Sequence, residues 1–267
     1  MNPGHLIVID LGKTLSKVSL WSHDGRMLDR QVRPNAPGSV DDILRLDVDG
    51  VGEWVLDQLA RHAGQPIAAI IPVGHGAGIV AVRDGAVAIA PFDYEQAIPD
   101  DVMADYRAAR DPFTVTGSPA LPYGLNLGAQ LYWMERRYPD AMAGATLIPW
   151  AQYWAWLLTG RAVSEVTSLG CHSDLWAPSE GDFSPMAYSM GWAARFAPLA
   201  RAADVVGTLS PAVAARTGLP ENVKVLAGIH DSNAALVAAR GFADIAGHEA
   251  TILSTGTWFV AMRLTAG

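Results

Sequence analysis

The order of apolar and polar residues predicts three short strands at the start of the chain. Residues 5–10 form an apolar run that ends at an aspartate, which is typical of a buried strand. Residues 17–21 alternate polar and apolar, as a half-buried strand does. The Asp24-Gly25 pair favours a tight hairpin turn into a third strand over residues 27–32. This opening differs from a dinucleotide fold, which would send a helix directly after its first turn.

Apolar residues at helical spacing first occur after these three strands. Residues 49–63 place apolar side chains on one face, and residues 67–73 are apolar enough for a buried strand. Strands are predicted at 79–82, 86–90, 146–148, 223–227, 251–253 and 258–262. Helices are predicted at 100–110, 126–138, 151–158 and 192–202 and just after Pro211, and residues 181–190 are predicted as a loop. The aromatic residues within 150–156 are expected to belong to the core.

Composition narrows the class of protein. Half of the 267 residues are hydrophobic, which is ample for a core, and the net charge is −8. A nucleic-acid partner is unexpected, because phosphate backbones demand clustered Lys and Arg. Cys171 is the only cysteine, which excludes an intrachain disulfide and fits a cytoplasmic location. No apolar run is long enough to predict a membrane partner or a signal peptide.

One polar stretch contains the main candidate for a catalytic residue. Residues 228–233 read Gly-Ile-His-Asp-Ser-Asn, after an apolar strand and before a run of helix-forming residues. In open α/β sheets, ligands bind where strands turn into helices. Asp231 can therefore accept a proton from a substrate hydroxyl. The alternative is a plain helix N-cap, for which Asp is a favoured residue. His230 beside it is a candidate substrate contact or merely a neighbour.

Two further turns have the chemistry of phosphate sites. Residues 10–14 read Asp-Leu-Gly-Lys-Thr, and Gly12 lets the backbone approach an anion. Asp10 can hold a hydrated Mg²⁺, and Lys13 or Lys17 can offset phosphate charge. An ordinary hairpin with a solvated aspartate is the alternative.

Residues 254–257 read Ser-Thr-Gly-Thr and supply hydroxyl and backbone donors suited to a nucleotide γ-phosphate. A plain polar turn is the alternative.

A sugar site is predicted at two more strand ends. Gly74-His75-Gly76 follows a buried strand, and His75 can hydrogen-bond a polyol through either ring nitrogen. A structural histidine is the alternative there. Asp93 and Tyr94 follow another apolar approach and are candidates to bind sugar hydroxyls, with a surface loop as the alternative. Cys171 and His172 are given no metal role.

Together these segments resemble the FGGY carbohydrate kinases of the actin/Hsp70/sugar-kinase superfamily. The matching segments are residues 10–17, 74–76, 157–160, 164–168, 228–236 and 253–258. Residues 230–233 and 254–258 look nearest to the rhamnulokinase and L-fuculokinase branch. Lys13 departs from the family, which usually has another residue there. Phe92 and Tyr94-Glu95 depart from it as well, in a segment that carries a Trp or Arg in many members.

The resemblance implies an α/β fold, namely a ribonuclease H-like lobe with a mixed β-sheet flanked by helices. It implies a sugar kinase in which Asp231 is the general base and ATP and Mg²⁺ are the cofactors. The nucleotide would contact Asp10, Gly12, Lys13, Thr14, Lys17, Thr255, Gly256 and Thr257, and Asp10 would hold Mg²⁺ through water. The sugar, a ketose or deoxyketose of the rhamnulose or fuculose type, would contact His75, Gly76, Asp93, Tyr94, His230 and Asp231.

The resemblance also divides the chain. Residues 1–245 correspond to the N-terminal sugar-binding lobe, and residues 246–267 to the start of a C-terminal nucleotide-binding lobe whose remainder is absent. A homodimer is left open. Two other functions are left open as well, a non-catalytic sugar-binding lobe and an actin- or Hsp70-like ATPase.

Overall fold

The computed structural model describes residues 4–255 and 259–264 and is built around one mixed sheet. The strand order across this sheet is β14-β15-β6-β1-β2-β3, and β16 also pairs with β6. The strands are β1 (His5–Leu11), β2 (Leu15–Trp21), β3 (Met27–Pro34), β6 (Ile67–Gly74), β14 (Val205–Thr208), β15 (Lys224–Leu226) and β16 (Ile229–His230). The three-stranded opening that the sequence predicted is therefore present, as two successive antiparallel hairpins.

The register brings three strand ends to one edge of the sheet. β1 and β6 are parallel, with Leu11 opposite Gly74. β16 is also parallel to β6, with His230 opposite Gly74. The segments that follow these strands therefore begin side by side, although they are far apart in the sequence. This edge is where open α/β sheets bind ligands.

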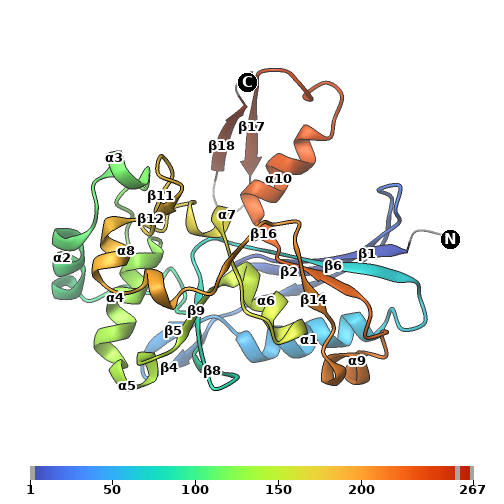
Figure 1. Ribbon diagram of the computed structural model, residues 1–267, viewed down its shortest axis with the longest axis horizontal. Helices are drawn as coiled ribbons and strands as arrows, with labels where there is room; N and C mark the ends of the chain where they lie inside the picture. Colours follow the sequence, from blue (N-terminus) through green and yellow to red (C-terminus); the bar gives the residue numbers. More distant parts are fainter. Residues whose placement is uncertain (1–3, 256–258, 265–267) are drawn as a thin grey trace.

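Three helices cover one face of the sheet. They are α1 (Val48–Ala60), α6 (Trp150–Thr159) and α9 (Pro211–Thr217), and Figure 1 shows them below the strands. α10 (Asp231–Arg240) lies on the other side of the sheet. Trp150, Tyr153 and Trp154 of α6 are each at most 3% exposed, so the aromatic cluster belongs to the core as predicted.

A second hydrophobic core lies beside the sheet, at the left of Figure 1. It packs a small sheet of order β8-β7-β9 against short helices. These strands are β7 (Ile79–Arg83), β8 (Ala86–Ile89) and β9 (Thr146–Pro149). The helices of this part are α2 (Asp100–Ala109), α3 (Phe113–Thr116), α4 (Leu127–Arg137), α5 (Pro139–Met142), α7 (Val166–Leu169) and α8 (Pro185–Ser189).

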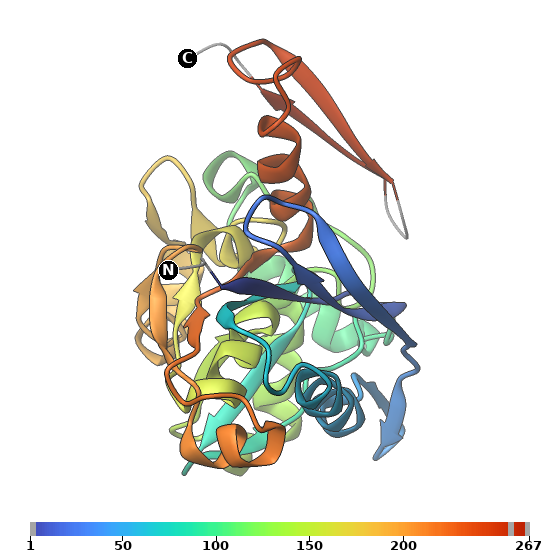
Figure 2. The same cartoon turned by 90° about the vertical axis from the view of Figure 1, so that its right-hand side faces the viewer.

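The last described elements form a separate antiparallel hairpin. β17 (Ala250–Thr255) pairs with β18 (Phe259–Leu264), and Figure 2 shows this hairpin running back beside α10, apart from the main sheet. The remaining short strands are β4 (Gly38–Val40), β5 (Ile43–Arg45), β10 (Ser164–Glu165), β11 (Trp176–Ala177), β12 (Asp182–Phe183) and β13 (Leu199–Ala200). Among the described residues, no helix combines the length and apolar composition that a bilayer crossing requires.

Three predicted elements differ from the structure. The helix predicted over residues 192–202 is wrong, because only Ala193–Arg195 form a 3₁₀ turn before β13. Pro198 explains this, since a proline disfavours helical angles at the residue before it. The loop predicted over residues 181–190 contains α8. Ser184 accepts a hydrogen bond from the Ala187 N–H there, and Pro185 occupies the first helical turn.

The third difference lies just before Asp231. The strand predicted over residues 223–227 is β15, and it is separated from β16 by Ala227 and Gly228. Gly228 has φ +86°, and a Cβ there would lie only 2.5 Å from the carbonyl oxygen of Pro72. A glycine is therefore required where the chain bends toward Asp231.

Candidate active site

A cavity of about 830 Å³ opens at the edge where β1, β6 and β16 end. Four segments supply its polar walls: residues 10–17, residues 75–77, residues 171–172 and residues 230–233. The β17–β18 hairpin closes one side with Ser254, Thr255 and three apolar residues of β18. Asp10 and Asp231, which are 221 positions apart in the sequence, thus face one cavity. Gly256 and Thr257, also predicted to contact the nucleotide, lie outside the described residues.

Asp10 occupies the end of β1 and is partly exposed to this cavity. Its Oδ2 lies 2.8 Å from Nζ of Lys17, directly opposite it on β2, and both side chains are 30% exposed. Gly12 and Thr14 line the cavity at the turn that follows. The Asn35 side chain donates to the Gly12 carbonyl oxygen at 2.9 Å, which holds this turn from outside. The turn is therefore supported by the protein while its cavity side remains open.

Asp231 is the first residue of α10, and its side chain is 38% exposed. The N-cap position belongs to His230, so the capping alternative for Asp231 is wrong. His230 Nε2 lies 3.2 Å from Asp231 Oδ1. The backbone N–H of Ser232 donates to the same Oδ1 at 2.6 Å. His230 Nδ1 lies 2.8 Å from the side-chain oxygen of Asn233, so both ring nitrogens have partners.

The backbone before Asp231 is held by a buried carboxylate. The His230 N–H donates to Oγ1 of Thr167 at 3.1 Å. The Thr167 hydroxyl and backbone N–H both donate to Oε2 of Glu165, at 2.5 and 2.9 Å. Glu165 is 2% exposed, and burial raises the pKa of its carboxyl. This chain of contacts joins α7 to β16 and sets where α10 begins.

His75 follows β6 and is 8% exposed. Its ring stacks on Trp150, and Tyr94 meets it edge-on, with centroids 5.7 and 5.5 Å away. Within the described residues, neither ring nitrogen has a hydrogen-bond partner. Burial lowers the pKa of His75 to about 3, and the charges of His230 and Lys13 act in the same direction. The ring is therefore neutral near pH 7 and offers a cavity ligand one donor and one acceptor.

Lys13 has a different partner from the one expected. Its ammonium group forms an ion pair with Asp93, lies 3.5 Å from Glu95 Oε2 and is 4.9 Å from the centre of the Tyr94 ring. Asp93 and Tyr94 are 1% and 4% exposed, so the surface-loop alternative for these residues is wrong. Lys13 therefore connects the first predicted phosphate turn to the predicted sugar segment. A second cavity of about 210 Å³ lies beside this ion pair.

The cavity also contains residues that the sequence reasoning did not assign to it. Among them are Ala77, Leu121, Leu125, Cys171 and His172. Ala77, Tyr94 and Leu125 form a small apolar cluster, with Leu121 packed against it. A Cβ on Gly76 would overlap the Cys171 sulfur, so glycine is required there. Burial raises the pKa of the Cys171 thiol to about 12. Residues 164–168, which resemble a segment over a sugar cleft, were the signal that pointed toward this region.

Comparisons with known proteins agree on one family. The model of the N-terminal domain of the FGGY family of carbohydrate kinases matches residues 112–238. The L-fuculokinase of Escherichia coli K12 is 29% identical over 149 residues, which is 52% of this chain and 29% of that relative.

Solved structures extend the similarity to the whole chain. A carbohydrate kinase from Novosphingobium aromaticivorans is 68% identical with a TM-score of 0.96, over 100% of this chain and 57% of that one. A xylulose kinase from Rhodospirillum rubrum is 23% identical with a TM-score of 0.73, over 88% of this chain and 51% of that one. The chain thus corresponds to part of each relative. Its mixed sheet and flanking helices are the ribonuclease H-like fold of sugar kinases, as expected. Residues 112–238 thus match the N-terminal domain of the FGGY family of carbohydrate kinases, and the whole chain is similar to part of one solved carbohydrate kinase.

Proposed function

We propose that the protein transfers the γ-phosphoryl group of ATP to a hydroxyl of a sugar. One observation carries the proposal: Asp231, Asp10, the turn at Gly12 and Thr14, and Thr255 all line a single cavity. Phosphoryl transfer needs a base for the attacking hydroxyl and donors for the transferred group. The match of residues 112–238 to the FGGY family of carbohydrate kinases supports the same activity.

Asp231 is the proposed general base. Its carboxylate accepts the proton of the sugar hydroxyl as that oxygen attacks the γ-phosphorus, and ADP leaves with the bridging oxygen and its electron pair. The proton therefore remains on Asp231 until it passes to solvent. The Ser232 N–H donates to Oδ1 of this carboxylate at 2.6 Å, and Oδ2 is the oxygen proposed to meet the substrate.

The donors for the phosphates are proposed to come from both ends of the chain. Gly12, Thr14, Thr255, Gly256 and Thr257 supply backbone and hydroxyl groups, as turns around a glycine do for anions. Lys17 and Lys13 bring positive charge close to this turn. Since Lys13 is paired with Asp93, we propose that it contributes by tying the turn to the sugar segment.

The residues present suit a magnesium ion that keeps most of its waters. The described residues contain no cluster of three or more acidic, histidine or cysteine side chains that could hold a metal ion. Magnesium usually takes only one or two carboxylates, together with waters and substrate phosphates. Asp10, partly exposed at the cavity, is the residue proposed to hold it through water. When bound, Mg²⁺ would neutralise charge on the nucleotide phosphates.

The sugar is proposed to be a ketose or deoxyketose of the rhamnulose or fuculose type. His75, Gly76, Asp93, Tyr94 and His230 are the proposed contacts, since His75 offers a donor and an acceptor that have no partner among the described residues. The apolar cluster of Ala77, Tyr94, Leu125 and Leu121 suits a methyl group in place of a hydroxyl. The L-fuculokinase relatives point to the same kind of sugar.

We further propose that residues 1–245 form the sugar-binding lobe and that residues 246–267 begin a nucleotide-binding lobe. Closure of two such lobes would exclude water and limit hydrolysis of ATP. A cytoplasmic location and a homodimer remain predictions.

The first experiment tests the general base in the full-length protein. Asp231→Asn should lower kcat by about 10²- to 10⁴-fold, the usual contribution of a general base, and leave sugar binding within about threefold. Coupled ADP release measures kcat, and calorimetry measures sugar binding. The matched control is Asp244→Asn, an exposed carboxylate outside the cavity, which should keep full activity. Retained turnover in Asp231→Asn would remove this residue from the role of base.

A second experiment separates the three functions. Thermal melting is recorded with ketoses and aldoses, with and without Mg-ATP. Stabilisation by sugar and by nucleotide supports a kinase. Stabilisation by sugar alone favours a non-catalytic sugar-binding lobe, and stabilisation by nucleotide alone favours an ATPase.

A further inference from the structure

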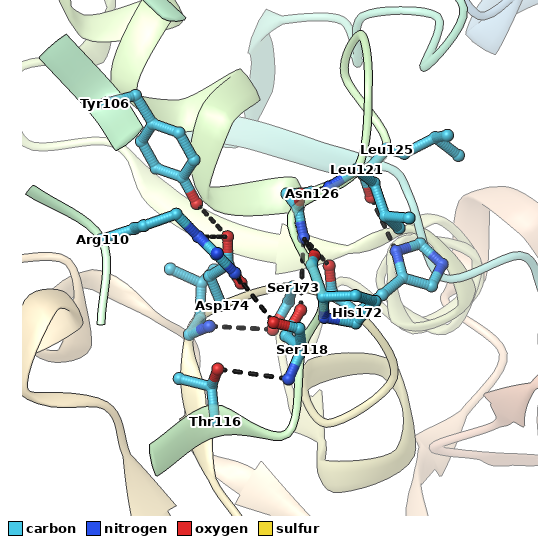
Figure 3. A network of polar contacts seen from close by, with 12 residues as sticks. Tyr106, Arg110, Thr116, Ser118, Leu121, Leu125, Asn126, His172, Ser173 and Asp174 are labelled. Carbon is cyan, nitrogen blue, oxygen red and sulfur yellow. Dashed lines mark hydrogen bonds and ion pairs between the residues drawn. The ribbon is translucent and has the colours of Figure 1, made fainter. Parts of the chain in front are cut away.

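His172 lies in the segment that follows α7 and lines the large cavity next to Cys171. Its ring nitrogen Nδ1 lies 2.6 Å from the carbonyl oxygen of Leu125, a contact drawn in Figure 3. Within the described residues, this is the ring's only hydrogen bond. The second ring nitrogen, Nε2, thus has no protein partner in that part of the chain.

The carbonyl partner decides which nitrogen carries the proton. A carbonyl oxygen can only accept a hydrogen bond, so Nδ1 must be the donor. Burial lowers the pKa of His172, and the charge of His230 also lowers it. The ring is therefore neutral near pH 7. In a neutral ring with a proton on Nδ1, Nε2 has a lone pair and is an acceptor only.

The backbone around His172 is held by a buried polar network. Nδ2 of Asn126 donates to the His172 carbonyl oxygen at 2.9 Å and to the Pro119 carbonyl oxygen at 3.1 Å. Oδ1 of Asn126 accepts from the Leu121 N–H at 2.8 Å. One amide side chain thus links His172 to the loop that carries Leu121 and leads to Leu125.

Two residues later, Asp174 anchors the same segment to the second core. Its side chain is 0% exposed and accepts from the Tyr106 hydroxyl at 2.5 Å. Arg110 donates to both of its oxygens, at 2.5 and 3.1 Å. Asp174 also has φ +67°, a conformation that Asp and Asn tolerate better than most residues. The position of the imidazole is therefore set by groups that no ligand needs to move.

We infer that His172 is a specificity-determining residue whose Nε2 accepts a hydrogen bond from one hydroxyl of the bound sugar. The inference rests on the proposed sugar-binding function. The neighbouring wall is apolar, being formed by Leu121, Leu125, Ala77 and the Tyr94 ring. A sugar hydroxyl placed beside His172 donates a hydrogen bond to the lone pair of Nε2. A keto oxygen or a deoxy position there leaves the lone pair unmatched in a partly buried site, which disfavours binding.

The test uses two substitutions at this position in the full-length protein. His172→Leu removes the acceptor, and His172→Gln offers an amide oxygen of similar reach. His23→Leu, at an exposed hairpin turn, is the matched control. Calorimetry without nucleotide measures binding of D-xylulose, L-fuculose, L-rhamnulose and D-fructose, and of singly deoxygenated forms of the tightest binder.

The expected result is a selective loss of affinity. His172→Leu should bind the tightest sugar about 10- to 100-fold more weakly, as expected for a lost hydrogen bond at a buried site. It should bind one deoxygenated form as the unchanged protein does, because the hydroxyl that His172 contacts is missing there. His172→Gln should recover much of the affinity, and kcat at saturating sugar should stay within about threefold. Equal weakening for every sugar and every deoxygenated form would overturn the inference.

A second measurement is independent of any sugar. Nitrogen-15 NMR of the histidine rings should show His172 neutral with its proton on Nδ1, in the absence of ligand. A proton on Nε2 would overturn the inference and leave the proposed kinase untouched. Conversely, sugar binding that depends on His172 without any phosphoryl transfer would overturn the kinase and leave the inference standing. Failure to bind any of the sugars would overturn both.

Discussion

The cavity has two walls of opposite character. The recognition wall, formed by His75, Tyr94 and His172, is buried or half-buried, and Asp174 anchors part of it with no exposure at all. The chemistry wall, formed by Asp10, Lys17 and Asp231, has side chains that are 30–38% exposed. Both walls line one cavity, but the side chains of the first wall are shielded from solvent and those of the second are partly exposed to it.

The difference follows from the cost of burying charge. A buried carboxylate without hydrogen-bond partners destabilises the folded protein by several kcal/mol. Asp174 accordingly accepts hydrogen bonds from Arg110 and Tyr106. Such a group cannot respond to a ligand. Asp10 and Asp231 keep contact with water and have few protein partners, which leaves lone pairs for a ligand. The recognition wall is therefore held in place by the protein before a ligand binds, and the carboxylates of the chemistry wall keep lone pairs that a ligand can use.

The largest effect is expected from a substitution at Asp174, the residue that anchors the recognition wall. Asp174→Asn keeps the backbone conformation but leaves the Arg110 charge uncompensated, so the free energy of unfolding should fall by about 3–5 kcal/mol. Urea unfolding followed by circular dichroism measures this. Asp244→Asn, on the exposed surface, should change the same quantity by less than about 0.5 kcal/mol. A loss below about 1 kcal/mol at position 174 would mean that the network does not hold the wall.

A smaller effect is expected behind the chemistry wall, at Thr167. Thr167→Val removes the acceptor for the His230 N–H and the donor to Glu165, at a cost of about 1–3 kcal/mol for the unpaired groups. If Thr167 positions Asp231, kcat should fall about tenfold while the Kd for sugar stays within about threefold. Thr167→Ser retains the hydroxyl and should restore kcat. Loss of stability with unchanged kcat would assign Thr167 a structural role only.

The smallest effect concerns the response of stability to pH. Burial lowers the pKa of His75 to about 3 in the folded state, against about 6.5 when unfolded. The unfolded state therefore binds more protons between these values. Stability from the neutral ring is fully present above about pH 6.5 and is lost as pH falls toward 3.

Replacing the His75 imidazole tests this pH dependence. His75→Gln should reduce the slope of unfolding free energy against pH by about 1.4 kcal/mol per pH unit between pH 4 and 6. Burial also lowers the pKa of His62 and His172, so part of the slope should remain. Denaturant unfolding at a series of pH values measures it. An unchanged slope would show that His75 is protonated or exposed in the folded protein.

Local patterns predicted the strands and most helices well, because alternation and turn chemistry act over a few residues. Asp24-Gly25 connects two antiparallel strands as expected. The prediction failed at residues 192–202, where apolar spacing was read as a helix although Pro198 prevents one. Within the site, Asp10 and Asp231 were found because each comes after a clear apolar run in the sequence. Their catalytic and metal-binding roles remain predictions.

Other site residues could not be found that way. Lys13 was expected to face phosphate, but its ion pair is with Asp93, 80 positions away. His172 had no local signal, since its hydrogen-bond donor and acceptor roles depend on the Leu125 carbonyl, 47 positions away.

The sequence by itself determined which segments become strands and turns, and which turns carry carboxylates, hydroxyls and glycines. These properties depend on neighbouring residues, so they can be read along the chain. Only the tertiary structure decided that β16 lies beside β6 and that Lys13 meets Asp93. Only it decided that Nδ1 of His172 meets the Leu125 carbonyl oxygen. The physical reason is that partners for buried polar groups come from distant segments, and folding alone brings them within hydrogen-bond distance.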